Sequence, residues 1–257
     1  MNLINILTII FEAVSLFNNV FACNVETPHC LSYYVCPKYT QMSCGGEGID
    51  GYTTYQLSLV VQDNKNVENV FALYGDEGKE MFIPSSYQLD GPFDTDLGGI
   101  SPSIISIFPD ALYDSWITIG ITDGDRNNKL STIGIDFSSW SDSSPIITTN
   151  GAVFLMDPTE LVSEKEYIIA QLTLSDSNNH HAKFNVNGKK ITGHGAWSQD
   201  NVRFDFTRTQ NNIPRDCAIW YDGCHICTAN NGNLGSCTNE QCMVYGTPEC
   251  RLHLSSH

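Results

Sequence analysis

Between residues 50 and 210, short segments in which apolar and polar residues alternate are separated by turns rich in Gly, Asn and Asp. The clearest is 115–122, where Trp116, Thr118 and Gly120 fall on one face, and the isoleucines at 117, 119 and 121 on the other. A period of two residues is typical of β-strands. The pattern predicts ten strands, at 52–62, 69–74, 79–83, 115–122, 130–137, 152–156, 167–174, 182–186, 189–192 and 202–206.

Ten short strands separated by turns favour an all-β fold, either a β-sandwich or a jelly roll. Asn187 and Gly188 predict a hairpin turn between the eighth and ninth strands. Only 102–108 and 158–166 have locally helical character. Alternate apolar residues of the strands are the expected core: Trp116, Ile117, Ile119, Ile133, Ile135, Phe137, Val153, Leu155, Ile168, Ala170 and Leu172.

The ten cysteines lie only near the two ends of the chain and divide it into zones. We expect a signal peptide at 1–22, a Cys-rich lead segment at 23–49, the β-sandwich domain at 50–210 and a Cys-rich module at 211–257. An even number of cysteines behind a signal peptide predicts disulfides, so the fold should carry small disulfide-rich N- and C-terminal segments. The expected disulfide cysteines are Cys23, Cys30, Cys36, Cys44, Cys217, Cys224, Cys227, Cys237, Cys242 and Cys250.

The first 22 residues resemble a secretory signal peptide. Apolar residues dominate from Leu3 to Phe17, and Val20 and Ala22 occupy the −3 and −1 positions of a small-residue cleavage site before Cys23. A membrane anchor is the alternative, but the stretch is short for a span and contains Glu12. No later segment reaches transmembrane length, so we expect a secreted or surface-associated protein without a membrane span after signal removal.

The net charge of −16 limits the partners of this chain. Phosphate groups repel such a protein, so we expect no nucleic-acid binding. An extracellular protein or a glycan remains as the expected partner. The acidic excess is either a solvated surface or a face that binds cations.

One acidic loop has the composition of a calcium site. Asp123, Asp125 and Asn127 place oxygen ligands at alternate positions, with Asp114 or Asp136 available to complete the set. The loop is not an EF-hand, because Gly134 stands where that motif has a bidentate Glu. A plain turn has the same composition, so calcium is a candidate cofactor beside a purely structural reading.

Local catalytic motifs are absent from the sequence: it has no H-E-x-x-H, no G-x-S-x-G and no phosphate-binding glycine loop. The sequence therefore favours a non-enzymatic role without establishing one. A glycan hydrolase using two carboxylates from distant parts of the chain stays open as an alternative.

The tail resembles the pacifastin type of small protease-inhibitor module. The matching residues are the C-x-x-C of Cys224 and Cys227, Gly232, and the C-T-x3-C that starts at Cys237. This chain departs from the family at Ala229, where the family has a cysteine, and at Cys250, which lies beyond the pattern. The resemblance would place the inhibitory loop at Thr238, Asn239 and Glu240. A structural disulfide knot and a zinc ribbon are the other readings of these cysteines.

Several phrases of the middle zone resemble a loosely defined group of secreted domains found in algae, marine protists, bacteria and large viruses. The phrases are ALYG at 72–75, GPFDTDLGG at 91–99, FPD at 108–110, YDSWITIG at 113–120, IGIDF at 133–137 and GAVF at 151–154, with WYDGC at 220–224 accompanying them. The resemblance implies an extracellular β-sandwich and transfers no catalytic residue. The signal peptide, the placement of the cysteines and the lack of a catalytic motif together lead us to expect a structural, surface or adhesive role.

Overall fold

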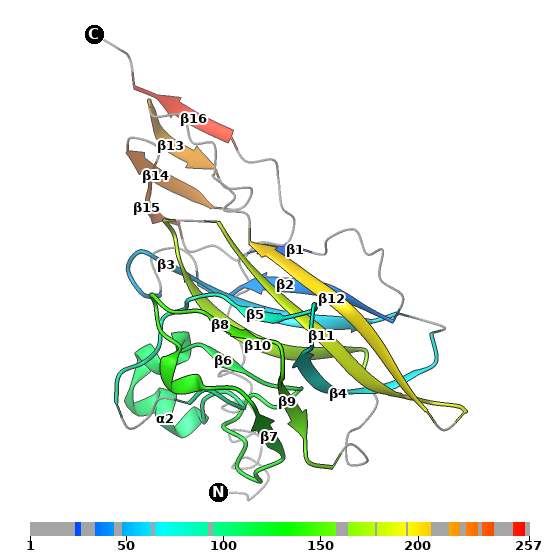
Figure 1. Cartoon of the computed structure of the whole chain (residues 1–257). Helices are drawn as coiled ribbons and strands as arrows, with labels where there is room; N and C mark the ends of the chain where they lie inside the picture. The colour runs from blue at the N-terminus through cyan, green and yellow to red at the C-terminus, as the bar shows by residue number, and fades with distance from the viewer. Residues whose placement is uncertain are drawn as a thin grey trace, which may run out of the picture.

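The structure is a computed structural model that describes residues 24–26, 34–43, 48–62, 65–91, 95–157, 164–177, 179–193, 195–206, 216–221, 225–230, 233–238 and 249–254. It is an all-β protein in which two antiparallel sheets form a sandwich and a smaller third sheet follows (Figure 1). The predicted fold class is confirmed.

The first sheet, sheet A, has the strand order β1-β2-β3-β10-β6, and all its pairs are antiparallel. Strand β2 comes from the predicted lead segment, yet it pairs with β3 over seven residues, so the lead and the middle zone share one sheet. The strands are β1 (Asn24–Glu26), β2 (Val35–Gln41), β3 (Tyr52–Val61), β6 (Trp116–Ile117) and β10 (Glu166–Ser175).

The second sheet, sheet B, has the order β7-β9-β4-β11-β5-β8, with β12 on the other edge of β11. Strands β4 and β5 follow each other along one edge of β11, because Tyr74 lies opposite Asn185 and Phe82 lies opposite Lys183. The strands are β4 (Val67–Gly75), β5 (Met81–Ile83), β7 (Leu130–Ile133), β8 (Ile146–Thr148), β9 (Gly151–Leu155), β11 (His180–Lys190) and β12 (Ala196–Phe206).

The core lies between these two sheets and draws large side chains from both. Fully buried members include Leu57, Leu59 and Leu172 of sheet A and Leu73, Phe184 and Phe204 of sheet B. Burying side chains of this size stabilises a fold by about 1.5–3 kcal/mol each. The predicted core residues that are buried are Trp116, Ile117, Ile119, Val153, Leu155, Ala170 and Leu172. Those that are partly buried against the core clusters are Ile135, Phe137 and Ile168.

Ile133 was expected in the core, and this prediction is wrong, because 67% of its surface is exposed. Gly134 takes φ +66°, which ends β7 after Ile133 and redirects the chain. Residues before and after that kink no longer alternate on one sheet face, so Ile135 packs against the core while Ile133 points outward. The predicted strand 130–137 is therefore a four-residue strand followed by a short 3₁₀ turn, η2 (Phe137–Ser139).

The hairpin turn predicted at Asn187 and Gly188 is also wrong. Both residues lie within β11, and the chain reverses only between Lys190 and Ala196. A Cβ atom on Gly188 would lie 2.0 Å from the Asn69 carbonyl oxygen and 2.3 Å from the Trp197 ring. The glycine is required for close packing of neighbouring strands and not for a turn.

The predicted strand 115–122 is shorter in the structure. Only Trp116 and Ile117 form β6, although the Thr118 and Gly120 amides still donate to carbonyls of β10. The chain bends at Gly120, which has φ +73°.

The helical segment predicted at 102–108 is confirmed as α2 (Pro102–Ile107). Of the segment predicted at 158–166, Glu166 begins β10 and residues 158–163 lie outside the described residues.

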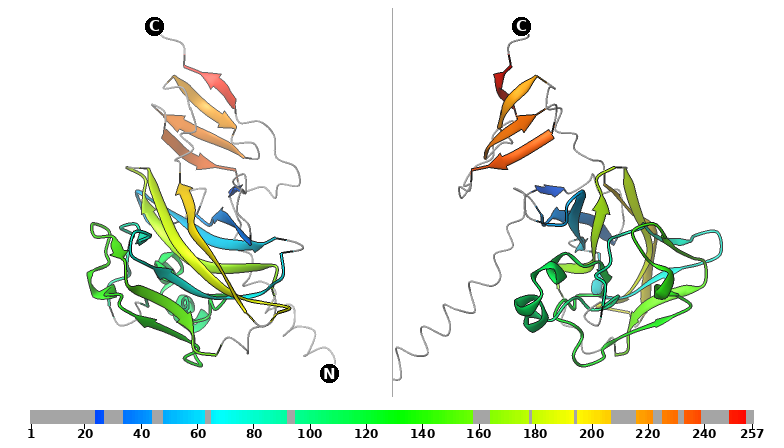
Figure 2. Two further views of the ribbon diagram at one scale, coloured as in Figure 1. Left: turned by 45° about the vertical axis from the view of Figure 1, so that its right-hand side comes forward. Right: turned by 90° about the vertical axis from the view of Figure 1, so that its left-hand side faces the viewer.

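A long excursion between β5 and β6 packs against the outer face of sheet A at β10 and β6. It contains α2 and the 3₁₀ turn η1 (Pro109–Tyr113), whose side chains pack with Trp116 and Ile168. Gln171 of β10 donates through Nε2 to the Leu112 carbonyl at 2.8 Å and the Asp114 carbonyl at 2.7 Å. Figure 2 shows this excursion lying outside the strands of the sandwich. The β10 and β6 part of this outer sheet face is thus covered by the chain itself.

Gln199 of β12 fastens the two sheets to each other at one side of the sandwich. Its Oε1 accepts hydrogen bonds from the Tyr34 and Val35 amides at 2.9 and 3.0 Å, and its Nε2 donates to the Val35 carbonyl at 2.9 Å. Beside it, the Tyr34 ring stacks on Trp197 with ring centroids 4.9 Å apart. Strand β2 of sheet A is thereby held against β12 of sheet B.

Asn185 of β11 makes a second buried connection, within sheet B. Its Nδ2 donates to the carbonyls of Tyr74 at 3.0 Å and Lys79 at 2.6 Å, and its Oδ1 accepts from the Asn201 amide at 2.9 Å. The residue is fully buried. One side chain therefore satisfies backbone groups of the β4–β5 turn and of β12, where Asn201 has φ +54°.

We predict that Asn185→Leu lowers the free energy of unfolding by about 3 kcal/mol, because three backbone groups lose their partner and each orphaned group costs about 1–3 kcal/mol. Urea unfolding of the full oxidised chain measures the loss. Asn187→Leu is the control, since Asn187 is half-buried two residues along the same face, and its cost should stay below about 1 kcal/mol. Equal losses in the two variants would contradict this role of Asn185.

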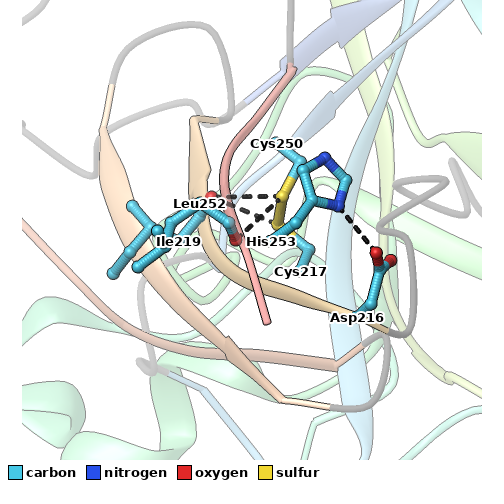
Figure 3. Close-up of a disulfide and its surroundings, with 6 residues drawn as sticks. All are labelled: Asp216, Cys217, Ile219, Cys250, Leu252 and His253. Atoms are coloured by element: carbon cyan, nitrogen blue, oxygen red, sulfur yellow. Dashed lines mark hydrogen bonds and ion pairs between the residues drawn. A yellow bond between two sulfur atoms is a disulfide. The ribbon is translucent and has the colours of Figure 1, made fainter. Parts of the chain in front are cut away.

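The third sheet, called the tail sheet, has the order β15-β14-β13-β16. Its strands are β13 (Cys217–Tyr221), β14 (Ile226–Asn230), β15 (Asn233–Cys237) and β16 (Glu249–His253). Disulfides join Cys217 to Cys250, across β13 and β16, and Cys227 to Cys237, across β14 and β15. Figure 3 shows the first of these beside the His253–Asp216 pair, whose Nδ1 and Oδ2 atoms lie 2.9 Å apart.

Candidate functional site

The outer face of sheet B carries apolar side chains where an antiparallel sheet facing solvent usually carries polar ones. The register brings them together: Phe82 lies opposite Ile147, Ala152 lies opposite both Tyr74 and Ile133, and Phe154 lies opposite Ala72. Directly opposed residues of antiparallel strands share a face. We call this surface the apolar face, defined by Tyr74, Phe82, Ile133, Ile147, Ala152 and Phe154.

Solvent reaches the apolar face. Ile133 is 67% exposed and Ile147 is 59% exposed, while the aromatic members are partly exposed. An open cavity of about 240 Å³ lies between β4, β7 and β9, lined by Tyr74, Ile133, Asn150 and Ala152 with three glycines. Exposed apolar surface gathered on one face of a protein commonly marks a binding surface.

Charged groups at the border of the apolar face are paired. Lys79 contacts Asp200 at 2.5 Å, Lys183 contacts Glu80 at 2.6 Å, and Arg203 contacts Asp205 at 2.7 Å. Three cations and three acids give these pairs no net charge. The Tyr74 hydroxyl donates to Asp200 at 3.4 Å, and burial together with the Asp200 charge raises the pKa of Tyr74, which therefore remains neutral at physiological pH.

His181 of β11 lies on the same side of sheet B. Its ring stacks on Phe82, with centroids 4.5 Å apart and planes 13° from parallel. Partial burial lowers the pKa of His181, and the nearby Arg203 charge lowers it further. The imidazole is therefore predominantly neutral at pH 7, so it adds aromatic surface rather than charge.

The structure places the predicted calcium ligands in separate local roles. The buried Asp114 carboxylate accepts from the Leu89 amide at 2.8 Å. Asp125 accepts from the Lys129 and Leu130 amides at 2.8 and 2.9 Å. Asp136 accepts from the Ser138 amide at 3.1 Å at the start of η2. Within the described ranges, no group of three His, Cys, Asp or Glu side chains is placed to hold a metal ion.

Asp123 and Asn127 are exposed in the same loop as Asp125. Asp123 forms an isolated backbone bridge with Gly99, and the Gly124 amide donates to the Gly98 carbonyl at 2.9 Å, so this loop rests on residues 98–99. An open polar cavity of about 410 Å³ lies beside it, and Arg126 and Lys129 line this cavity together with the acids. The calcium site stays a prediction, since each Asp125 carboxylate oxygen accepts one backbone amide and keeps a second lone pair that could coordinate a cation.

We predict that Asp125→Ala lowers the free energy of unfolding by about 2 kcal/mol in the presence of a chelator, because two amides lose a charged acceptor. A calcium site predicts, in addition, a rise of the wild-type unfolding midpoint with calcium that the variant lacks. Thermal unfolding with calcium and with chelator measures both effects. Asp123→Ala is the control for the loss of stability in chelator, since Asp123 is exposed. An equal loss of unfolding free energy in Asp123→Ala would contradict the structural role of Asp125.

The structure describes one of the three residues of the predicted inhibitory loop, Thr238. Thr238 directly follows β15, where its amide donates to the Ile226 carbonyl at 3.0 Å and its hydroxyl accepts from the Ile226 amide at 3.1 Å. Asn239 and Glu240 of the predicted inhibitory loop lie outside the described residues. Inhibition stays a prediction that neither contact of Thr238 tests.

Five of the predicted disulfide cysteines are described, and all five are bonded: Cys36, Cys217, Cys227, Cys237 and Cys250. Cys23, Cys30, Cys44, Cys224 and Cys242 lie outside the described residues.

The tail sheet has a small core, in which Cys217 and Trp220 are buried against Ala229 and Cys250. So small a core needs covalent support.

We predict that reduction unfolds the tail sheet and leaves the sandwich folded. The two tail disulfides span sequence separations of 33 and 10 residues, and each constrains the unfolded chain by roughly 3–4 kcal/mol. Hydrogen exchange followed by mass spectrometry should show that β13 and β16 lose protection in reductant while β10 and β11 keep it. Simultaneous loss of protection in β10 would contradict this independence.

Sequence reasoning did not find the apolar face. Ile133 is predicted as a core residue and the other five members have no predicted role, because composition does not distinguish an exposed apolar residue from a buried one. The useful signal was parity: Leu130 and Ile133 stand three residues apart in one strand, so only one of them can face the core.

Comparison with known proteins adds no further constraint on the site. No family model, curated protein or solved structure matches this chain. In the portion of the chain described by the structure, no helix is long and apolar enough to cross a membrane. The site therefore has to be interpreted from its own geometry.

Proposed function

We propose that this chain is a secreted, surface or matrix-associated binding protein whose sandwich presents the apolar face to an extracellular ligand. The observation that carries the proposal is the exposure of Ile133 and Ile147 on the outer face of sheet B. Disulfides on both sides of the cysteine-free middle agree with an oxidising, extracellular location.

The contrast between the two outer faces supports this proposal. Sheet A buries the outer side of β10 and β6 under the excursion that contains α2, whereas sheet B leaves its apolar face open to solvent. Covering each exposed isoleucine with a ligand would contribute about 1–2 kcal/mol at 25 cal/mol per Å² of buried apolar surface. A ligand spread over the face would gain from several such side chains at once.

The test is retention of the full oxidised chain on solid supports. The panel contains cellulose, chitin, β-glucan particles and immobilised collagen. The double variant Ile133→Lys/Ile147→Lys alters the apolar face, and Ile107→Lys/Leu254→Lys is the control, because both control positions are exposed, apolar and outside sheet B, with the same charge change.

We expect wild type and control to be retained on at least one support, and the apolar-face variant to bind more weakly by a factor of about thirty or more. Equal retention of the two variants would overturn the proposal. So would the absence of retention on every support. Far-ultraviolet circular dichroism verifies that both variants are folded.

A further inference from the structure

We propose that the ligand of the apolar face is a neutral, polymeric glycan. This inference rests on the proposed function and specifies the ligand class of the same surface.

The apolar face is broad and continuous across strands. Ile133, Ala152 and Tyr74 lie on the neighbouring strands β7, β9 and β4, and Tyr74 lies opposite Asn185 on β11. Asn185 is fully buried, so the exposed row runs from Ile133 to Tyr74, and with strands about 4.8 Å apart it covers about 10 Å. Phe82 and Ile147 form the adjacent row on β5 and β8. Such a surface suits an extended ligand better than a small molecule, which binds in enclosed pockets.

Polar groups interrupt the apolar face at intervals. Asn150 is exposed beside the 240 Å³ cavity. Ser131 lies opposite Phe154, and Asn187 lies opposite Ala72. Sugar rings present C–H groups on their faces, which pack on aromatic and aliphatic side chains, and hydroxyls at their edges, which bond to amides and hydroxyls. The alternation of apolar and uncharged polar groups matches that chemistry.

The charge of the chain disfavours anionic ligands. The three cations bordering the face are paired with Asp200, Glu80 and Asp205, which leaves them less available to an anionic glycan. The chain carries −16 overall, so an acidic polysaccharide, an anionic membrane and a second copy of the chain are all repelled. A neutral ligand meets no such penalty.

The experiment is affinity electrophoresis of the full oxidised chain in gels containing mixed-linkage β-glucan, xyloglucan or galactomannan, with alginate as the acidic comparison. We expect retardation by at least one neutral polymer and none by alginate. In an equilibrium binding assay with the same polymer, binding should persist at about 1 M salt, where charges are screened beyond roughly 3 Å. Phe82→Leu should weaken binding about two- to tenfold, because it removes a ring and keeps an apolar side chain.

Phe108→Leu is the matched control, since Phe108 is 43% exposed at the end of α2 and lies outside sheet B. Equal effects of Phe82→Leu and Phe108→Leu on glycan binding would overturn the inference. In another outcome, the chain is retained on collagen through Ile133 and Ile147 while no neutral polymer retards it. That result would overturn the inference of a glycan ligand and would leave the proposed function standing. Absence of any binding that depends on these two residues would overturn both.

Discussion

The sandwich depends on the hydrogen-bonded clamp between Gln199 and Val35. A side-chain amide offers the same donor and acceptor as a peptide group, so Gln199 pairs with the backbone of β2 as a neighbouring strand would. The clamp lies where β2, at one side of sheet A, meets β12, at one side of sheet B. Tyr39 packs on Phe206 farther along the same two strands, with ring centroids 5.3 Å apart. The two sheets therefore keep one fixed relation without a disulfide between the two strands.

The way the two sheets pack together decides which of their outer surfaces a ligand can reach. The excursion across sheet A is anchored by polar groups that are themselves buried: Thr173 donates to the Tyr113 carbonyl, and its amide donates to the Ser115 hydroxyl at 3.0 Å. Buried polar networks of this kind specify one arrangement, because a shifted excursion would orphan several groups at once. The part of sheet A formed by β10 and β6 is consequently covered, whereas the apolar face of sheet B is open to solvent.

The fold was predictable where the local pattern alone decides structure, as in β3, β4, β9 and β10, whose predicted ranges end within a few residues of the observed ones. Prediction failed where distant residues decide. Gly188 has the local signature of a turn, but its conformation is set by Asn69 and Trp197 packing on either side. The loop of Asp125 has a composition shared by turns and calcium sites, and only the hydrogen bonds to Lys129 and Leu130 reveal its structural role. Composition could not predict the apolar face, because the strand register decides which side chains point away from the core.

An exposed apolar face carries a hazard of self-association, and the charge of the chain offsets it. Two copies approaching face to face each bring a net charge of −16, and repulsion between such molecules acts over about a Debye length, roughly 8 Å at physiological ionic strength. Apolar contact gains energy only at van der Waals distance, so the repulsion is met first. An uncharged ligand meets no such barrier. In the proposed function, the same acidic excess opposes self-association through the exposed side chains of Ile133 and Ile147, and it favours uncharged partners for the surface that they form.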